Sequence, residues 1–225
     1  SDRVKLYTGF TEMGQGHDGV MSQMASEATG LSADCFVVEC STRCMVNTGM
    51  TTASRGTYLG GKGVQAAAKG LVKDLERVGG DLGELVGQVY KGEWIAPPTD
   101  QPGSGATAPV THYAFGYASQ LAIVDADGKL EEVVAAHDVG RAINRIGCEG
   151  QVEGAVHMGI GYALSEEQLV DEEGWPDPRY RSLGIIPADK MPKLTTLLLE
   201  HPDPSGPWGA KGLGEIGLVP TAPAI

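Results

Sequence analysis

Positive charge is scarce in this sequence. The 225 residues include 17 Lys and Arg against 29 Asp and Glu, which gives a formal net charge of −12. Proteins that bind nucleic acids or anionic lipid surfaces present clusters of Lys and Arg that neutralise phosphate groups. No such cluster occurs along this chain. We therefore expect neither nucleic acid nor a membrane among its partners.

Long apolar runs are also missing. No stretch of the sequence reaches the roughly 18 uninterrupted apolar residues that a membrane-spanning helix needs. The first residues, Ser1-Asp2-Arg3-Val4-Lys5, lack the apolar segment of a secretory signal peptide. The sequence therefore predicts a soluble protein with a cytoplasmic location.

Cysteine is sparse, and no two of the four cysteines form a Cys-x-x-Cys pair, which argues against a disulfide scaffold. Cys35, Cys40 and Cys44 are close enough in sequence to suggest an iron–sulfur or zinc site. They fall in or beside a candidate strand, where alternate side chains point to opposite faces and cannot all converge on one metal. We expect free thiols and no cluster.

Glycine, in contrast, is abundant. The 33 glycines make up about 15% of the chain, roughly twice the usual share. They do not follow the three-residue period of collagen, so they mark turns and close backbone approaches. With 41% apolar residues, the chain can bury one large core or two ordinary ones.

The hydrophobic pattern alternates between strand and helix periods, which predicts an α+β fold with mixed sheets and packed helices. Strands are expected at residues 4–7, 35–40, 113–124, 130–136 and 195–200. Helices are expected at residues 20–28 with an end at Gly30, and at residues 64–78, 150–169 and from 218 onward. A turn at residues 125–128 makes a hairpin of the third and fourth strands. We divide the chain into a first α+β segment, 1–96, a surface connection, 97–110, and a second α+β segment, 111–225.

Three glycine-rich loops each hold one or two polar residues. They are Met13-Gly14-Gln15-Gly16, Thr52-Ala53-Ser54 and Lys211-Gly212-Leu213-Gly214-Glu215. Loops that expose backbone amides at the start of a helix bind anions or polar heterocycles, even in an acidic protein. Neither the GxGxxG nor the GxxxxGK[ST] pattern occurs at a strand–helix junction, which argues against nicotinamide and nucleoside triphosphate ligands. Each loop taken alone is more often a tight turn than a ligand site.

Five motifs occur in a fixed order along the chain. They are Gly14-Gln15-Gly16 before a helix, Thr51-Thr52-Ala53-Ser54-Arg55, Asp138-Val139-Gly140-Arg141-Ala142-Ile143-Asn144, Glu149-Gly150-Gln151-Val152-Glu153-Gly154 and Gly209-Ala210-Lys211-Gly212-Leu213-Gly214-Glu215. In this order they resemble the molybdenum hydroxylases of the xanthine dehydrogenase/aldehyde oxidase family. The resemblance covers nearly the whole chain and corresponds to the C-terminal part of the molybdopterin-binding large subunit, so we expect a fragment of a longer protein. Residues 173–217 look most like the selenium-dependent xanthine dehydrogenase branch.

The resemblance implies that Glu215 is the catalytic base. In such enzymes a pterin dithiolene holds the molybdenum, and usually no protein side chain ligates the metal. A glutamate takes the proton of a metal-bound hydroxyl group, whose oxygen attacks an electron-poor carbon, and water replaces that oxygen. A carboxylate among glycines suits this role because a flat substrate can approach it closely.

The resemblance also assigns the cofactor contacts. Glutamine suits a pterin edge because its amide both donates and accepts hydrogen bonds. The matched positions are Gly14, Gln15, Ala53, Ser54, Gln151, Lys211, Gly212, Leu213 and Gly214. Lysines like Lys211 are most often solvated, which makes it the weakest of these matches. Met158 stands where many family members have a glutamine, which weakens any substrate inference from this motif, and His157 before it is expected to be a structural helix residue.

The function implied is oxidation of a purine-like N-heterocycle, with water as the oxygen source and electrons passed to iron–sulfur centres. The cofactor would be molybdenum–molybdopterin in the phosphate or cytosine dinucleotide form. The 2Fe-2S centres and an FAD group would lie on other domains or subunits of a dimeric enzyme, so this chain alone should be inactive. The alternatives are an aldehyde oxidase of the same family and a non-catalytic module for cofactor binding or assembly.

Overall fold

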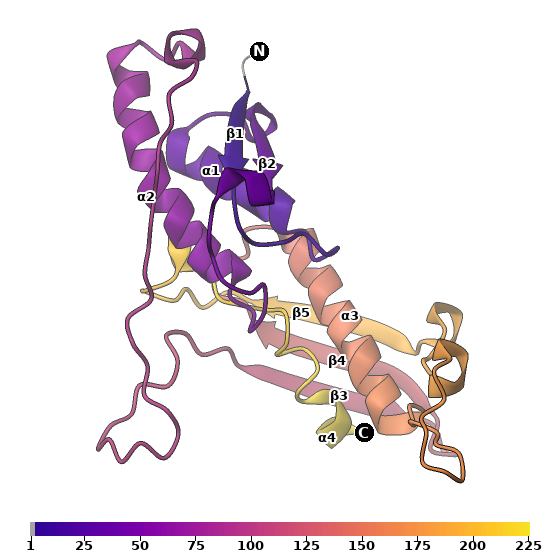
Figure 1. The fold of residues 1–225 in the computed structure, drawn as a ribbon. Helices are drawn as coiled ribbons and strands as arrows, with labels where there is room; N and C mark the ends of the chain where they lie inside the picture. The colour runs from indigo at the N-terminus through magenta and orange to yellow at the C-terminus, as the bar shows by residue number, and fades with distance from the viewer. Residues whose placement is uncertain (1–2) are drawn as a thin grey trace. The chain divides into compact units, whose positions relative to one another are not determined.

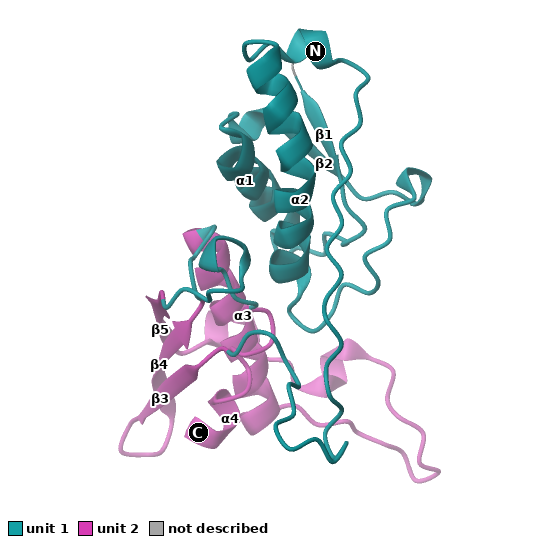
Figure 2. Cartoon of the chain, turned by 90° about the vertical axis from the view of Figure 1, so that its left-hand side faces the viewer, with its two compact units in different colours: residues 1–115, 140–144, 201–212 teal, residues 116–139, 145–200, 213–225 magenta. Residues whose placement is uncertain are grey.

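A computed structural model describes residues 3–225 of the chain. The chain forms two compact units, each assembled from separate stretches of sequence (Figure 2). Unit 1 comprises residues up to 115 together with 140–144 and 201–212, and unit 2 comprises residues 116–139, 145–200 and 213–225. Both units combine helices with a small sheet, which confirms the α+β fold class. The division into cofactor-binding segments at residues 97–110 stays a prediction.

Unit 1 begins with a strand–helix–strand element. β1 (Val4–Tyr7) pairs in parallel with β2 (Phe36–Glu39), and α1 (His17–Thr29) connects them. Gly30 ends α1 in the left-handed conformation, with a φ of 74°, and its amide donates to the Ser26 carbonyl at 2.8 Å. The two strands and the helix end therefore follow the sequence prediction closely.

The long helix α2 (Gly56–Arg77) packs against α1. Its apolar side chains recur every three or four residues, so they lie on one face. Gly61 on this face permits close packing, because a Cβ there would lie 2.8 Å from the sulfur of Met24 and 2.7 Å from Pro207. The buried core that results comprises Met21, Met24, Ala25, Phe36, Val64 and Ala210, and a second cluster comprises Leu71, Leu75 and Leu85.

The segment after α2 is bound to that helix before it becomes exposed. The Tyr90 hydroxyl donates to the Asp74 carboxylate at 2.8 Å. The Trp94 ring packs edge-on against Tyr58 of α2, with ring centroids 6.2 Å apart. Residues 97–110 are almost entirely exposed. The chain therefore follows α2 as far as Trp94.

Unit 2 contains a three-stranded sheet in the order β3-β4-β5. β3 (Ala118–Val124) and β4 (Leu130–Asp138) form an antiparallel hairpin, which confirms the prediction. The hairpin turn uses Gly128 at a φ of 82°, and the Gly128 amide donates to the Asp125 carbonyl at 3.1 Å. β5 (Lys193–Leu199) pairs in parallel with β4 on its other side.

Helix α3 (Arg145–Leu164) connects β4 to β5 and covers one face of the sheet (Figure 1). The buried side chains of β4 alternate along the strand, at Val133, Ala135 and His137. The sequence placed this helix five residues too late, at 150–169. The amides of Ser165 and Glu166 both donate to the Gly161 carbonyl, which ends the helix before the apolar residues that follow it.

A loop leaves α3 and returns to β5. Its two ends are joined, because the Ser165 hydroxyl donates to the Gly184 carbonyl at 2.7 Å and the Glu167 amide donates to the Leu183 carbonyl at 3.1 Å. The last helix is the short α4 (Thr221–Ala224). The sequence predicts a helix from residue 218 onward, so α4 begins three residues later than expected. The short 3-10 helices are η1 (Ala33–Cys35), η2 (Thr42–Cys44), η3 (Leu82–Leu85), η4 (Tyr180–Leu183), η5 (Ala188–Lys190) and η6 (Pro207–Gly209).

Candidate functional site

The loop between β1 and α1 carries the predicted cofactor residues Gly14 and Gln15. Gly14 and Gly16 have φ angles of 99° and 80°, a conformation that glycine adopts without steric cost. The Glu12 carboxylate accepts hydrogen bonds from the amides of Gly14 at 2.6 Å, Gly16 at 3.1 Å and Asp18 at 3.0 Å. A side chain of the loop itself thus holds three backbone donors at the start of α1.

The side chain of Gln15 is also bonded within this loop. Its Oε1 accepts from the Met13 amide at 2.5 Å, and its Nε2 donates to the Thr11 carbonyl at 2.8 Å. A primary amide has two donor hydrogens and an oxygen with two lone pairs, so one donor and one acceptor position remain for a ligand. Gly14 beside it is exposed, with no atom within 4 Å of the place where a Cβ would stand.

The second predicted loop, before α2, contains two consecutive residues in a left-handed conformation. Ala53 has a φ of 57° and Ser54 a φ of 48°. For residues other than glycine this costs on the order of 1–3 kcal/mol each, and such strain is concentrated at functional sites. The guanidinium group of Arg55 donates from Nε and Nη2 to the Met50 carbonyl, at 3.0 and 2.7 Å, and closes the loop.

The two loops lie together within unit 1. The Thr11 amide of the first loop donates to the hydroxyl of Thr51 in the second, at 2.9 Å. The ring of His17 lies against the start of α2, where a Cβ on Gly56 would be 3.2 Å from the His17 Nδ1. The N-termini of two helices, with their partial positive charge, are therefore brought side by side.

His17 is buried between these loops. Its side chain is 4% exposed, and its Nε2 has no hydrogen-bond partner among the described residues. Burial lowers the pKa of His17 below its usual value of 6.5, and this effect outweighs the negative charges of Asp18 and Glu12, which raise the pKa. The imidazole is thus kept neutral, with an unsatisfied nitrogen beside the glycine loops.

The third predicted loop begins in unit 1 with Lys211 and Gly212. Gly212 lies directly on the Ser54 loop, because a Cβ on Gly212 would clash with the Ser54 carbonyl oxygen. Lys211 is only 7% exposed, and its side-chain stem lies against Gly140. The lysine is therefore buried, unlike most lysines in glycine-rich loops, and its match to a cofactor-binding position stays a prediction.

The remaining predicted residues belong to unit 2. Gln151 is half-buried on α3, and Leu213 is buried. Gly214 and Glu215 are exposed, in a turn where the Leu218 amide donates to the Glu215 carbonyl at 3.2 Å. An exposed carboxylate on a short turn is accessible to a ligand.

The turn at Glu215 is anchored by residues that the sequence did not point to, on β3, α3 and α4. A Cβ on Gly217 would lie 2.6 Å from the Cβ of Ala155 on α3, so the backbone of the turn lies directly on the helix. The Gln120 side chain donates from Nε2 to the Gly217 carbonyl at 2.8 Å, and the Thr221 hydroxyl donates to the same oxygen at 3.2 Å. The sequence did hold one signal for Gln120, because it is a polar residue at a position of β3 that points inward.

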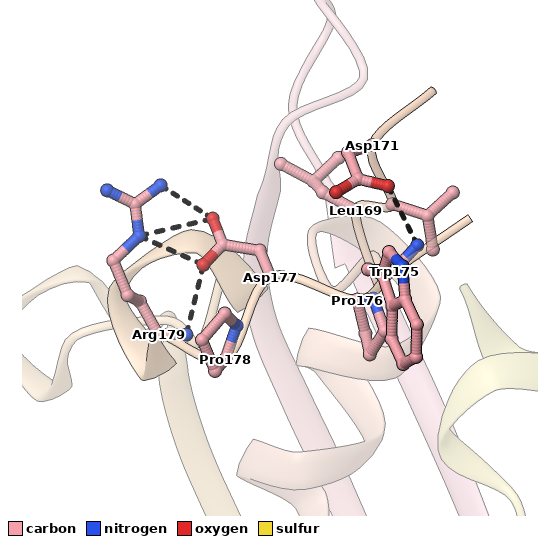
Figure 3. Close-up of a pocket in the computed structure, with 8 residues that line it drawn as sticks. Leu169, Asp171, Trp175, Pro176, Asp177, Pro178 and Arg179 are labelled. Atoms are coloured by element: carbon pink, nitrogen blue, oxygen red, sulfur yellow. Dashed lines mark hydrogen bonds and ion pairs between the residues drawn. The ribbon is translucent and has the colours of Figure 1, made fainter. Parts of the chain in front are cut away.

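A separate hollow of about 500 Å³ lies in the loop after α3 (Figure 3). Its two carboxylates are engaged within the loop. Asp171 accepts from the Trp175 amide at 2.8 Å, and Asp177 forms an ion pair with Arg179 at 2.6 Å. None of the predicted site residues lines this hollow.

Three further features bear on the sequence predictions. The four cysteines are free, and no group of three or more His, Cys, Asp or Glu side chains that could hold a metal ion is found in residues 3–225. None of the helices in the described part of the chain is long and apolar enough to span a membrane. The Nε2 of His157 lies 2.7 Å from the Ile186 carbonyl oxygen, in keeping with a structural role.

Comparison with known proteins identifies the family. Residues 1–183 match the model of the molybdopterin cofactor-binding domain. The chain belongs to this family. It is 28% identical to the gamma subunit of the 6-hydroxypseudooxynicotine dehydrogenase complex of Paenarthrobacter nicotinovorans, over 99% of the chain and 32% of that protein. It is 26% identical to a putative xanthine dehydrogenase molybdenum-binding subunit of Escherichia coli, over 99% of the chain and 34% of that protein.

A solved structure shares the fold. The aldehyde oxidoreductase of Desulfovibrio desulfuricans superposes with a TM-score of 0.80 and 27% identity, over 99% of the chain and 26% of that protein. The chain thus spans about a third or less of the length of the relatives it matches. These matches confirm the prediction of a molybdopterin-binding domain of the xanthine dehydrogenase and aldehyde oxidoreductase family. The selenium-dependent branch is not distinguished.

The residues of unit 1 fit a pterin cofactor. Gln15 keeps a free donor and a free acceptor position, the glycines beside it are exposed, and His17 presents a buried nitrogen that lacks a partner. The Gln15 amide is uncharged, which suits a neutral heterocycle edge, whereas the backbone amides of Gly14, Gly16 and Asp18 are already bonded to Glu12.

Proposed function

We propose that the chain forms part of the large subunit of a molybdenum-dependent hydroxylase, in which its loops bind the pterin cofactor and Glu215 is the catalytic base. The observation that carries the proposal is the pairing of the Gln15 and Ser54 loops at two adjacent helix N-termini. Membership of a cofactor-binding family supports it.

In unit 1 the cofactor contacts are assigned to six residues of the three loops. The free amide hydrogen and lone pair of Gln15 bind a pterin edge, and the absence of a side chain at Gly14 lets the ring system approach. Ser54 donates from its hydroxyl group, and Ala53 leaves room beside it. Gly212 supplies backbone contacts. The ammonium group of Lys211, the weakest assignment, is held by its buried stem.

In unit 2 the contacts are assigned to Gln151 on α3 and to the backbone of Leu213 and Gly214. Glu215 follows directly, and its exposed carboxylate is open to a planar substrate. When bound, the molybdenum cofactor supplies a two-electron oxidant and a reactive hydroxyl group. With that group bound, Glu215 would act as the general base that accepts a proton at its carboxylate.

The proposed substrate is a purine-like N-heterocycle. The resemblance of residues 173–217 to the selenium-dependent xanthine dehydrogenases supports it, as does similarity to a putative xanthine dehydrogenase subunit. An aldehyde is the second candidate, favoured by the match to an aldehyde oxidoreductase across nearly the whole chain. The same base and cofactor loops would serve both.

The complete enzyme needs partners, because two electrons must leave the reduced metal. We assign them to 2Fe-2S centres and an FAD group on other domains or subunits of a cytoplasmic dimer. The cofactor is molybdopterin in its phosphate or cytosine dinucleotide form.

The test is metal and pterin analysis of the complete enzyme, followed by turnover with an artificial electron acceptor. We expect stoichiometric molybdenum and oxidation of xanthine or hypoxanthine at rates well above those for aldehydes. The reverse preference would identify an aldehyde oxidase. A protein that lacks molybdenum, or that carries it without turning over either substrate class, would support the non-catalytic module and overturn the proposal.

A further inference from the structure

The Glu215 turn rests on a buried polar network in unit 2. Gln120 on β3 and His137 on β4 lie side by side. The Nε2 atom of Gln120 is 3.2 Å from the Nε2 atom of His137. The same Gln120 nitrogen is 2.8 Å from the carbonyl oxygen of Gly217. Gly217 is two residues after Glu215, so this network reaches the backbone of the turn.

The two contacts fix the orientation of the Gln120 amide. Its NH₂ group has two hydrogens, and the Gly217 oxygen and the His137 Nε2 are the two acceptors in reach. The flipped amide would place its own oxygen against the Gly217 carbonyl oxygen, which is repulsive. His137 therefore accepts at Nε2 and carries its hydrogen on Nδ1. Burial lowers the pKa of His137, in agreement with a neutral ring.

This network leaves polar atoms unsatisfied. Gln120 Oε1 and His137 Nδ1 are buried without a hydrogen-bond partner among the described residues, and His137 is 0% exposed. A buried polar atom without a hydrogen bond destabilises the folded state, because it has lost its water without gaining a partner. Two apolar side chains would fill the same space without this cost. What the polar pair provides in return is the hydrogen bond from Gln120 to the Gly217 carbonyl, which belongs to another segment of the chain.

Other contacts also hold the turn, and the Thr221 hydroxyl donates to the same Gly217 oxygen at 3.2 Å, longer than the 2.8 Å bond from Gln120. Gly217 lies against Ala155 of α3, and the Leu218 amide bonds back to the Glu215 carbonyl. Because the Leu218 amide links this backbone to Glu215, a shift of the Gly217 carbonyl would also shift the turn and change the direction of the Glu215 side chain. We propose that Gln120 is a positioning residue for Glu215, acting through the Gly217 carbonyl. The proposal rests on the proposed role of Glu215 as the base.

The test uses the Gln120→Met variant of the complete enzyme. Methionine keeps an unbranched chain of similar length but cannot donate a hydrogen bond. Hydrogen exchange of the segment 213–221 should become about fivefold faster, as expected for the loss of one neutral hydrogen bond. Molybdenum content and KM should stay unchanged, while kcat should fall about three- to tenfold. Gln120→Asn, which keeps the amide but withdraws it by one methylene, should show the same pattern.

The control is Gln101→Met, an identical change at an exposed position of the connection, which should match wild type in every readout. Unchanged exchange at 213–221 in both Gln120 variants would overturn the positioning role, whatever Glu215 does. So would a kcat loss of Gln120→Met that persists in full when Glu215 is replaced by Gln, because the two residues would then act independently. Full turnover of Glu215→Gln alone would overturn the proposed function and leave the exchange result standing.

Discussion

The Gln15 loop of unit 1 and the Glu215 turn of unit 2 are held in different ways. The Gln15 loop is tied by side chains of its own segment, with Glu12 and Gln15 bonding backbone groups two to six residues away. The Glu215 turn is tied by groups that are remote in sequence, such as Gln120, which lies 97 residues from Gly217. Apart from the hydrogen bond of the Thr11 amide to Thr51, the first loop is shaped by its local sequence, whereas the second depends on the sheet and the helix packed against it.

This difference matches the roles proposed for the two regions. A cofactor-binding loop that is formed locally is ready to receive its ligand without rearrangement. A base must be aimed at a reacting atom, and small errors in its position cost rate. Support from β3 and α3 ties the direction of the Glu215 turn to the most deeply buried part of unit 2.

The largest expected effect separates chemistry from cofactor binding. Glu215→Gln keeps the size of the side chain but cannot accept the proton. We expect turnover of the complete enzyme to fall by roughly 10²–10⁴, about 3–5 kcal/mol of barrier, with full molybdenum content. Steady-state kinetics and metal analysis measure the two quantities. Glu131→Gln, at an exposed glutamate on β4, is the matched control; a near-normal kcat in Glu215→Gln would contradict the assignment.

The opposite pattern is expected in the Gln15 loop. Gln15→Ala removes the amide that bonds Met13 and Thr11 and that we assign to the pterin. Molybdenum and pterin content should fall several-fold, while kcat per bound molybdenum stays close to wild type. Metal content by mass spectrometry decides this. A variant with full metal content and slow turnover would place Gln15 in the chemistry instead.

Two glycines on α3 test how closely this helix packs against Thr221, one of the residues that anchor the Glu215 turn. A Cβ on Gly159 would lie 2.6 Å from the Thr221 hydroxyl and 2.9 Å from its methyl group, whereas Gly154 has no atom within 4 Å. Gly159→Ala should destabilise the fold by about 1–3 kcal/mol through overpacking. Gly154→Ala should stabilise it by about 0.5–1 kcal/mol through helix propensity. Thermal unfolding compares them, and equal effects would refute this packing.

The smallest expected effect concerns Glu12. Burial raises the pKa of its carboxyl group, but hydrogen bonds from the amides of Asp18, Gly14 and Gly16 outweigh this, so that the pKa lies below its usual 4.5. The folded state then binds protons less readily than the unfolded state, and the stabilisation is complete above pH 4.5 and is lost as the pH falls through the lowered pKa. Glu12→Gln should cost about 1 kcal/mol at pH 7, as for a lost helix cap.

Denaturation over a pH series measures this contribution. The difference between wild type and Glu12→Gln should shrink as the pH falls below 4.5, because the wild-type carboxyl group is then protonated. A difference that is constant across this range would show that the charge of Glu12 does not hold the loop.

The sequence predicted most elements whose signals are local. The first two strands, the end of α1 at Gly30 and the hairpin turn at Gly128 all follow from periodicity and glycine placement. The helix at 150–169 was misplaced because Leu169 and Val170 continue its apolar pattern into the loop. Its end is set by amide bonds to Gly161 that no periodicity reveals.

The candidate site was predictable only in part, for the same reason. Resemblance to a family supplied Gln15, Ser54 and Glu215, and the glycine loops supported them. Gln120 and His137 stayed hidden because they belong to strands far from the motifs and meet the turn only through tertiary packing. The burial of Lys211 against Gly140 was equally invisible, since nothing local distinguishes a buried lysine stem from a solvated one.

The joined ends of the loop after α3 have a practical consequence. Because Ser165 bonds Gly184 and Glu167 bonds Leu183, the two ends of the stretch between them lie close together within unit 2. Such a stretch can be exchanged as a cassette. A fluorescent label or an affinity peptide grafted in place of residues 170–180 would report on the protein during purification, and the helix and strand on either side would keep their register.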